Sequence, residues 1–391
     1  MIPQKTFFNK QDLQDILCGA VLLASGGGGA IKNGQQLIES ILNISDQVEY
    51  IEPANVDKFK YMPVLAGLGS PDAFEKQGFS RSPQMVFEVL EQVKQRSYPQ
   101  ENQQYRFSYT VPVETGAVAH FTAMLVAVQK GIAVVDGDGG GRAFPSLAMA
   151  SFAEAINNKT VVPVSPVVIA TEQELEAGGT EVEFNQNDPA IVDDLGRAII
   201  DTPEFKDVAA IACFAMDGET MQKAIVPNTL TRARKVGRLI RDAVQNQKNP
   251  VTDVLSYLDG YQLFQGKITD IKEHTQGGFD FGTVVIESAT GKKAYILNQN
   301  ENLVAWSDQE DRPLAIAPDL ICYMGTDGQT LSNADIKLGQ DVTLIGVKAP
   351  EQLRKPYFIN VFGKALKNLG YYGSYVPIEH LQSIPATELE D

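Results

Sequence analysis

Hydrophobic positions follow helical and then strand-like patterns in the first part of the chain. Apolar side chains recur three and four residues apart between Asn9 and Leu23, which predicts a helix capped by Asn9. The same spacing predicts a second helix over residues 34–42. Three short apolar runs then predict buried strands at Tyr61–Ala66, Phe107–Val113 and Ile132–Val135.

A crossover helix is predicted between the last two strands. Residues 116–130 carry apolar side chains at helical spacing, and strands joined by a crossover helix run parallel. The pattern therefore predicts an α/β domain with a mostly parallel sheet and glycine-rich loops over residues 1–166.

The pattern changes after residue 166. Helices are predicted at 189–201 and 227–247, and short alternating segments separated by glycine turns follow at about 262–350. We expect residues 167–391 to form an α+β domain that contains this small β-rich subdomain. Two domains suit a length of 391 residues, which exceeds what one core usually organises.

Charge and cysteine content narrow the function classes. The chain has 33 Lys and Arg against 49 Asp and Glu, and a net charge of −16 disfavours nucleic acid and anionic membranes as partners. No apolar run reaches the ~18 residues of a membrane span. Three cysteines far apart in sequence, Cys18, Cys213 and Cys322, suit a reducing compartment. We expect a cytoplasmic protein, and we expect it to form a homo-oligomer.

The first candidate for chemistry is a glycine loop that follows the first helix. It comprises Ser25, Gly26, Gly27, Gly28 and Gly29. Backbone N–H groups without side chains around them can point at an anion or a polarised carbonyl beside a helix N-terminus. The loop has neither the P-loop lysine nor the surroundings of a dinucleotide fingerprint, so we expect no nucleotide cofactor. The alternative is a flexible hinge.

The second candidate follows the strand at 132–135. Asp136, Asp138, Gly139 and Arg142 lie in one glycine-rich turn, where open α/β sheets gather ligands. Two carboxylates and a guanidinium supply a base and an anion clamp. The alternative is a turn in which Asp136 caps a helix and Arg142 neutralises it.

The third candidate lies at the end of the preceding strand. Glu114 and Gly116 close that strand, and His120 follows one helical turn later. Neighbouring parallel strands lie ~4.8 Å apart, so Glu114 and Asp138 could share one small-molecule site. The alternatives are that Glu114 only favours the helix N-terminus and that His120 is a core or surface histidine.

The fourth candidate is the pair Asn300 and Glu301, which ends a predicted strand in the β-rich subdomain. Turn chemistry explains the pair, and the functional alternative is a carboxylate that reaches a ligand. The three histidines are scattered, so a divalent metal is an open alternative only through oxygen ligands, which favour hard metals. Such a site would use Glu114, Asp136 and Asp138.

Together these motifs resemble the family named for S-methyl-thiohydantoin desulfurase, over nearly the whole chain. The segments that carry the resemblance are SGGGGA, PVETG, VVDGDGGGRAFP, NENL and APDLI. The matching positions are Ser25 to Gly29, Glu114, Gly116, Asp136, Asp138, Gly139, Gly141, Arg142, Phe144, Pro145, Asn300 and Glu301. The sequence departs from the family pattern at His120, where Asn is common.

The resemblance implies a hydrolase-type, desulfurase-like enzyme for a small cyclic amide-like metabolite. It would displace the S-methyl group of a thiohydantoin, or act on a similar hydantoin-like ring, and release methanethiol. By this hypothesis Asp138 or Glu114 activates water, and Asp136 orients the base or binds a metal. The backbone of Gly26–Gly29 holds developing negative charge, and Arg142 clamps the substrate. Replacing Arg142 with Ala is then expected to abolish turnover with little change in melting temperature.

Two other interpretations stay open. One is a metal-dependent hydrolase of another cyclic amide. The other is a non-catalytic partner or ligand-sensing subunit of a hydantoinase-like protein, the kind of partner that the resemblance implies. Every interpretation with a shared pocket requires the acidic and glycine-rich turns to meet at one edge of the sheet.

Overall fold

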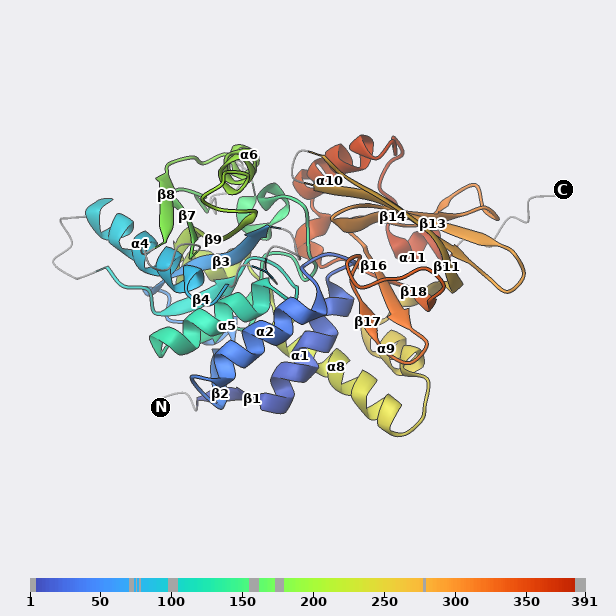
Figure 1. Cartoon of the computed structure of the whole chain (residues 1–391), viewed down its shortest axis with the longest axis horizontal. Coiled ribbons are helices and arrows are strands. Elements are labelled where there is room, and N and C mark those ends of the chain that lie inside the picture. Colours follow the sequence, from blue (N-terminus) through green and yellow to red (C-terminus); the bar gives the residue numbers. More distant parts are fainter. Residues whose placement is uncertain are drawn as a thin grey trace. The chain divides into compact units, whose positions relative to one another are not determined.

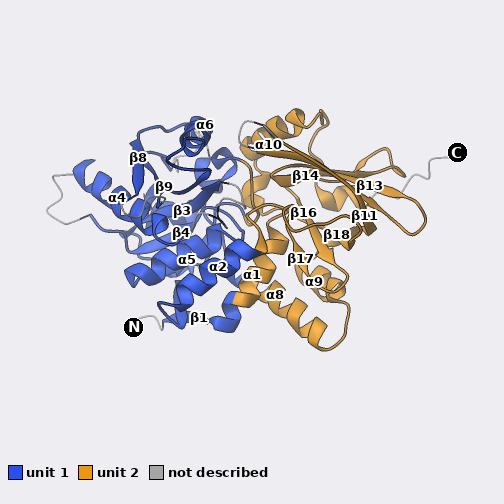
Figure 2. Cartoon of the chain, viewed as in Figure 1, with its two compact units in different colours: residues 1–13, 32–140, 146–231 blue, residues 14–31, 141–145, 232–391 orange. Residues whose placement is uncertain are grey.

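The structure is a computed structural model that describes residues 5–69, 74, 76, 79–97, 105–154, 162–172, 179–276 and 279–383. The chain divides into two compact units (Figure 2). The first unit comprises residues 1–13, 32–140 and 146–231, and the second comprises residues 14–31, 141–145 and 232–391. These bounds differ from the expected division at residue 166, because strands that follow this residue join the sheet of the first unit.

Within the described residues, the first unit holds an eight-stranded mixed sheet in the order β1-β2-β5-β4-β3-β9-β7-β8. Its strands are β1 (Thr6–Asn9), β2 (Gln47–Ile51), β3 (Tyr61–Gly69), β4 (Tyr109–Pro112), β5 (Ala133–Val135), β7 (Val167–Thr171), β8 (Thr180–Phe184) and β9 (Val208–Asp217). A separate antiparallel pair is formed by β6 (Gly137–Asp138) and β10 (Val226–Pro227).

The helices and 3-10 turns of this unit are α2 (Ile31–Leu42), α4 (Ser82–Ser97), α5 (Ala119–Lys130), α6 (Pro189–Ile200), α7 (Gly218–Ala224), η1 (Pro53–Asn55), η2 (Leu147–Met149) and η3 (Ser151–Ala153). Two more helices, α1 (Lys10–Leu23) and α8 (Thr229–Gln245), have residues in both units. The first helix begins where the sequence predicts, because Asn9 and Asp12 each accept a backbone hydrogen bond from the other at 3.0 Å.

Four strands of this sheet, β2, β5, β4 and β3, run parallel. The α5 crossover joins β4 to β5 and packs on β4 and β3, while α4 packs on β9 and β7 (Figure 1). Helix α5 is capped at its C-terminus by Gly131, whose left-handed φ of 66° a glycine adopts without strain. The α/β class and the parallel strands predicted from the sequence are confirmed.

The other part of the sheet is antiparallel. Strand β9 pairs with β3 on one side and with β7 on the other, and β8 covers the far edge of β7. Residues Val208–Ala215 of β9 are all buried, as expected for a central strand covered on both faces. The sequence pattern did not predict this half, because it assigned residues 167–217 to the second domain.

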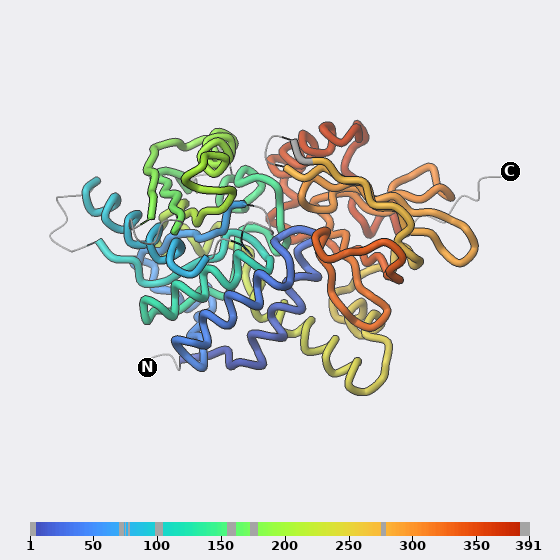
Figure 3. The backbone as a smooth tube through the Cα atoms, viewed as in Figure 1, coloured from blue at the N-terminus to red at the C-terminus, as the bar shows by residue number. Residues whose placement is uncertain are grey.

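The second unit is built on an antiparallel sheet with the order β15-β14-β13-β12-β11-β18-β16-β17. Its strands are β11 (Tyr261–Gln276), β12 (Phe279–Glu287), β13 (Lys293–Gln299), β14 (Glu301–Ser307), β15 (Pro313–Ile316), β16 (Leu320–Gly325), β17 (Thr330–Leu331) and β18 (Asp341–Val347). The remaining helices are α9 (Pro250–Leu258), η4 (Glu351–Arg354), α10 (Pro356–Asn368) and α11 (Ile378–Leu381). The tube drawing traces the chain through both units (Figure 3).

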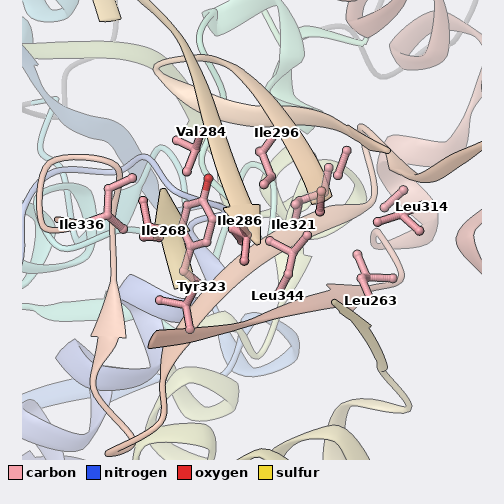
Figure 4. Packing of buried hydrophobic residues seen from close by; sticks show 14 of the residues in the cluster. Leu263, Ile268, Val284, Ile286, Ile296, Leu314, Ile321, Tyr323, Ile336 and Leu344 are labelled. Carbon is pink, nitrogen blue, oxygen red and sulfur yellow. The ribbon is translucent and has the colours of Figure 1, made fainter. Parts of the chain in front are cut away.

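The core of this sheet follows strand periodicity. Alternate residues such as Val284 and Ile286 of β12 and Ile296 of β13 point into one apolar cluster with Ile321 and Leu344 (Figure 4). The intervening side chains face the other way, and this alternation is the pattern that predicts the β-rich segment at 262–350. The C-terminal β-rich arrangement is confirmed.

Helices α1 and α8 cross at two glycines in the second unit. A Cβ placed on Gly19 would lie 1.9 Å from the carbonyl oxygen of Ala233, and one placed on Gly237 would lie 1.9 Å from that of Asp15. The Asp15 carboxylate also accepts hydrogen bonds from Arg241 Nε and Nη2 at 2.8 and 3.0 Å. No helix among the described residues is both long and apolar enough to cross a membrane.

Candidate functional site

The acidic turns of the first unit meet at the carboxyl ends of two neighbouring strands. Strands β4 and β5 pair in parallel, with Tyr109 opposite Ala133. The segments that follow them, residues 113–118 and 136–140, therefore leave the sheet at the same edge. This edge is where ligands bind in open α/β sheets.

Asp138 is the centre of a buried polar network at this edge. Its Oδ2 atom accepts hydrogen bonds from Thr115 Oγ1 at 2.6 Å and pairs with His120 Nε2 at 2.9 Å. Its Oδ1 atom accepts a hydrogen bond from the backbone N–H of Gly140 at 2.8 Å. Asp138 and His120 have no exposed surface. The carboxylate is thus held by donors of the protein and fixes the histidine ring.

The orientation of His120 defines a candidate base. An ionised carboxylate only accepts hydrogen bonds, so the neutral ring carries its hydrogen on Nε2 and presents a lone pair at Nδ1. Among the described residues, Nδ1 has no hydrogen-bond partner. A buried lone pair on an oriented imidazole is the arrangement that general-base chemistry needs.

Asp136 binds the N-terminus of helix α8. Its Oδ1 atom accepts hydrogen bonds from the backbone N–H groups of Leu230 and Thr231 at 3.0 Å, and its Oδ2 accepts one from Thr231 Oγ1 at 2.7 Å. The side chain therefore caps the first turn of α8, which is the alternative that the sequence left open. Burial raises the pKa of Asp136, and the hydrogen bonds from Thr231 and Leu230 oppose the shift.

The other expected residues of this edge are two glycines and Glu114. Gly116 accepts a backbone hydrogen bond from His120 through its carbonyl oxygen at 3.4 Å. A Cβ on Gly139 would lie 2.5 Å from the carbonyl oxygen of Val113, which explains the glycine. Glu114 is half-buried and directly precedes Thr115.

The glycine loop belongs to the second unit and packs against the turn between β13 and β14. The carbonyl oxygen of Ser25 accepts a hydrogen bond from Asn302 N, and that of Gly26 accepts one from Asn333 N, both at 2.7 Å. Ser25 and Gly26 have left-handed φ angles of 56° and 87°. Gly28 also has a left-handed φ of 72°. Backbone hydrogen bonds from Asn302 and Asn333 therefore hold the loop in this conformation.

Gly27 lies directly against Glu301. A Cβ on Gly27 would be 2.0 Å from Glu301 Oε1, and Glu301 is only 4% exposed. The Glu301 side chain therefore occupies the space beside Gly27. Gly29 completes the loop with a left-handed φ of 91°.

Asn300 shapes the turn that meets the loop. It has a left-handed φ of 58°, and its Oδ1 atom accepts a hydrogen bond from Asp280 N at 2.9 Å. Its carbonyl oxygen accepts a hydrogen bond from Asn333 Nδ2 at 2.7 Å. Turn chemistry therefore explains Asn300.

Arg142 is a buried cross-link of the second unit. Its guanidinium donates hydrogen bonds to backbone carbonyl oxygens of Ala143, Pro318, Asp319 and Asn302 at 2.8–3.1 Å. The side chain has no exposed surface. These contacts give Arg142 a role in positioning backbone segments, and its expected role as a substrate clamp stays a prediction.

Some residues of both networks were not expected from the sequence. Thr115 stands inside the PVETG segment, so a search for hydroxyls beside acidic residues could have found it. Asn302 stands inside the NENL segment and donates its backbone N–H to the glycine loop. Asn333 lies in no motif, and only the fold brings it to Gly26. Within the described part of the chain, no group of three or more His, Cys, Asp or Glu side chains is placed to hold a metal ion.

The fold and these networks define a class: a protein with an α/β unit that carries a buried Asp–His pair and a second unit built on an antiparallel sheet. Comparison with protein families identifies both parts of the chain. Residues 11–177 match the S-Me-THD-like N-terminal domain, and residues 186–378 match the S-Me-THD-like C-terminal domain. The chain belongs to the S-Me-THD-like family, as the sequence motifs predict.

The chain is also similar to a solved structure. An X-ray crystal structure of a protein from Chromobacterium violaceum, determined by the Northeast Structural Genomics Consortium, aligns with a TM-score of 0.80 and 28% identity. The alignment covers 95% of this chain and 100% of the other. A comparison with curated proteins gave no match.

Proposed function

We propose that this chain hydrolyses a small cyclic amide-like metabolite of the S-methyl-thiohydantoin class, with His120 as the general base and Asp138 as the group that orients it. The observation that carries the proposal is the buried Asp138–His120 pair, in which His120 Nδ1 has no partner among the described residues. Membership of the S-Me-THD-like family supports the choice of substrate class.

The proposed step balances as a hydrolysis. The oxygen of a water molecule bonds to the ring carbon that carries the S-methyl group while His120 Nδ1 accepts one proton of that water. The carbon–sulfur bond then breaks, and the leaving thiolate takes this proton to become methanethiol. The second proton of the water passes from its oxygen to the ring nitrogen that was double-bonded to this carbon, which leaves an N–H group beside the new carbonyl. The products are methanethiol and a hydantoin.

Asp138 contributes through the tautomer of His120. Its carboxylate holds the hydrogen on Nε2 and stabilises the imidazolium that forms when Nδ1 accepts a proton. Thr115 and Gly140 fix the carboxylate in turn. Glu114 is the alternative base, and the substrate-binding roles expected for Ser25–Gly29, Gly116, Gly139, Asn300 and Glu301 stay predictions.

The direct test incubates the purified protein with an S-methyl-thiohydantoin and measures methanethiol with a thiol-reactive chromogenic reagent. H120N is the sharp variant, because Asn keeps a donor toward Asp138 but has no basic nitrogen. We expect H120N to release methanethiol at least 100-fold more slowly than the wild type. E114Q is the matched variant of the alternative base and should stay within threefold of the wild type. Loss of turnover in E114Q with full activity in H120N would transfer the base to Glu114.

A further inference from the structure

Two further buried hydroxyl groups belong to residues that lie along the segment carrying Asp138. Ser151 is 3% exposed and Thr229 is 2% exposed. Among the described residues, neither Ser151 Oγ nor Thr229 Oγ1 has a hydrogen-bond partner. His120 Nδ1 likewise is buried and has no hydrogen-bond partner among the described residues.

Hydrogen bonds connect the residues of all three groups, or their direct neighbours, to the segment 136–139. Ser151 donates its backbone N–H to the carbonyl oxygen of Gly139 at 2.6 Å. His120 reaches the segment through Asp138. Thr229 is anchored by its two neighbours, whose backbone N–H groups donate to Asp136: Asn228 to the carbonyl oxygen at 2.8 Å, Leu230 to Oδ1 at 3.0 Å.

The helix cap does not account for Thr229. A hydroxyl in the first turn of a helix often caps it, but Asp136 already accepts the hydrogen bonds of the first turn of α8. Ser151 begins η3, and the N-cap of that turn is Ala150, which makes no side-chain hydrogen bond. Neither hydroxyl is therefore needed for local structure.

Such groups are costly to the fold. A buried hydroxyl that loses its hydrogen bond to water destabilises the folded state, whereas Ala or Val at the same place would fill nearly the same space without that penalty. Hydroxyls in this condition are typical of positions that serve a ligand, where function opposes stability. The hydrogen bonds that tie all three residues to one segment indicate a common guest.

We infer that Ser151 and Thr229 bind the attacking water of the proposed hydrolysis and position it against His120 Nδ1. This inference rests on the proposed function. Each hydroxyl can accept a hydrogen bond from the water or donate one to its oxygen, and His120 accepts the proton that leaves. The two residues thus act on the nucleophile and not on the ring of the substrate.

The test compares S151A and T229V with the wild type in the methanethiol assay. We expect kcat to fall at least 10-fold in each variant with KM within about twofold, because the change removes contacts with water and not with the ring. The melting temperature should stay equal or rise. T229S restores the hydroxyl and should recover kcat to within threefold.

T122A is the matched control. Thr122 is fully buried on α5, like His120, but its hydroxyl donates to the carbonyl oxygen of Val118 at 2.8 Å in its own helix. We expect T122A to keep its kcat. An active wild type with S151A and T229V unchanged in kcat would overturn the inference alone. So would a fall in kcat matched by a fall in melting temperature, which is the mark of a structural role. A wild type that releases no methanethiol would overturn the proposed function, and the inference with it.

Discussion

Gly27 leaves the space that the Glu301 carboxylate occupies. A Cβ at Gly27 would lie 2.0 Å from Glu301 Oε1 and 2.5 Å from its Cγ. Gly27 does not have a left-handed φ, so the requirement for glycine is steric and comes from a residue 274 positions later in the sequence. This contact explains one glycine of the loop without any ligand.

G27A is therefore expected to destabilise the protein by about 2 kcal/mol, because the added methyl group overpacks a buried contact. E301A in the same chain should recover most of the loss, since it opens the space. The free energy of unfolding of the two single variants and the double variant, measured by urea denaturation, gives the coupling. Additive effects would contradict the assigned contact. Gly363, whose Cβ would meet no atom within 4 Å, supplies the control G363A.

R142A is expected to lower the free energy of unfolding by about 3 kcal/mol or more, because buried carbonyl oxygens lose their charged donor. This outcome reverses the expectation from the sequence, in which turnover is lost and the melting temperature is kept. Thermal and urea denaturation of R142A and R142K decide between them. A fully stable R142A without turnover would return Arg142 to the role of substrate clamp.

G237A is expected to destabilise the crossing of α1 and α8 by about 3 kcal/mol. A Cβ there would lie 1.9 Å from a backbone oxygen of Asp15, and a backbone cannot move aside as cheaply as the end of a side chain. Equilibrium denaturation measures the loss, with G363A as the control. If G237A were as stable as the wild type, the close crossing would be wrong.

Asp193 gives the stability of the protein a predictable dependence on pH. Its carboxylate accepts hydrogen bonds from Ser146 Oγ and Leu147 N, yet burial raises its pKa from 3.8 to about 6. Because the folded-state pKa lies above the unfolded value, the contribution to stability is complete below about pH 4 and declines as the pH rises to about 6. The change is on the order of 3 kcal/mol.

D193N isolates this effect, because it does not titrate and its side-chain oxygen can still accept from Leu147 N. Urea denaturation from pH 4 to pH 7 should show the wild type losing stability relative to D193N across that range. Parallel curves for the two proteins would exclude Asp193 as the cause.

The spacing of apolar residues predicted those elements of the fold that depend on neighbouring positions in the sequence. The helix after Asn9, the α5 crossover and the β-rich segment follow directly from spacing of apolar residues. The pairing of β9 with β3 joins segments almost 150 residues apart, and buried apolar strands look alike whichever neighbour they take. The antiparallel half of the first sheet could not be predicted for that reason.

In the candidate site, too, the sequence identified single residues but not their distant partners. Motifs found Asp138, the glycine loop and Glu301, because residue type and spacing mark them. The partners of these residues decide what they do, and partners such as Thr231 for Asp136 or Pro318 for Arg142 are distant in sequence. For this reason the sequence could not show that Asp136 caps α8 and that Arg142 binds backbone carbonyl oxygens.

The role of the Asp138–His120 pair can be measured through D138N, by comparing its kcat for methanethiol release with that of the wild type. An amide at position 138 can turn its NH2 group toward His120 Nε2, which moves the ring hydrogen to Nδ1 and removes the base. We predict a fall of about 100-fold or more with an unchanged melting temperature. A D138N variant within threefold of the wild type would contradict the claim that the Asp138–His120 pair drives the reaction.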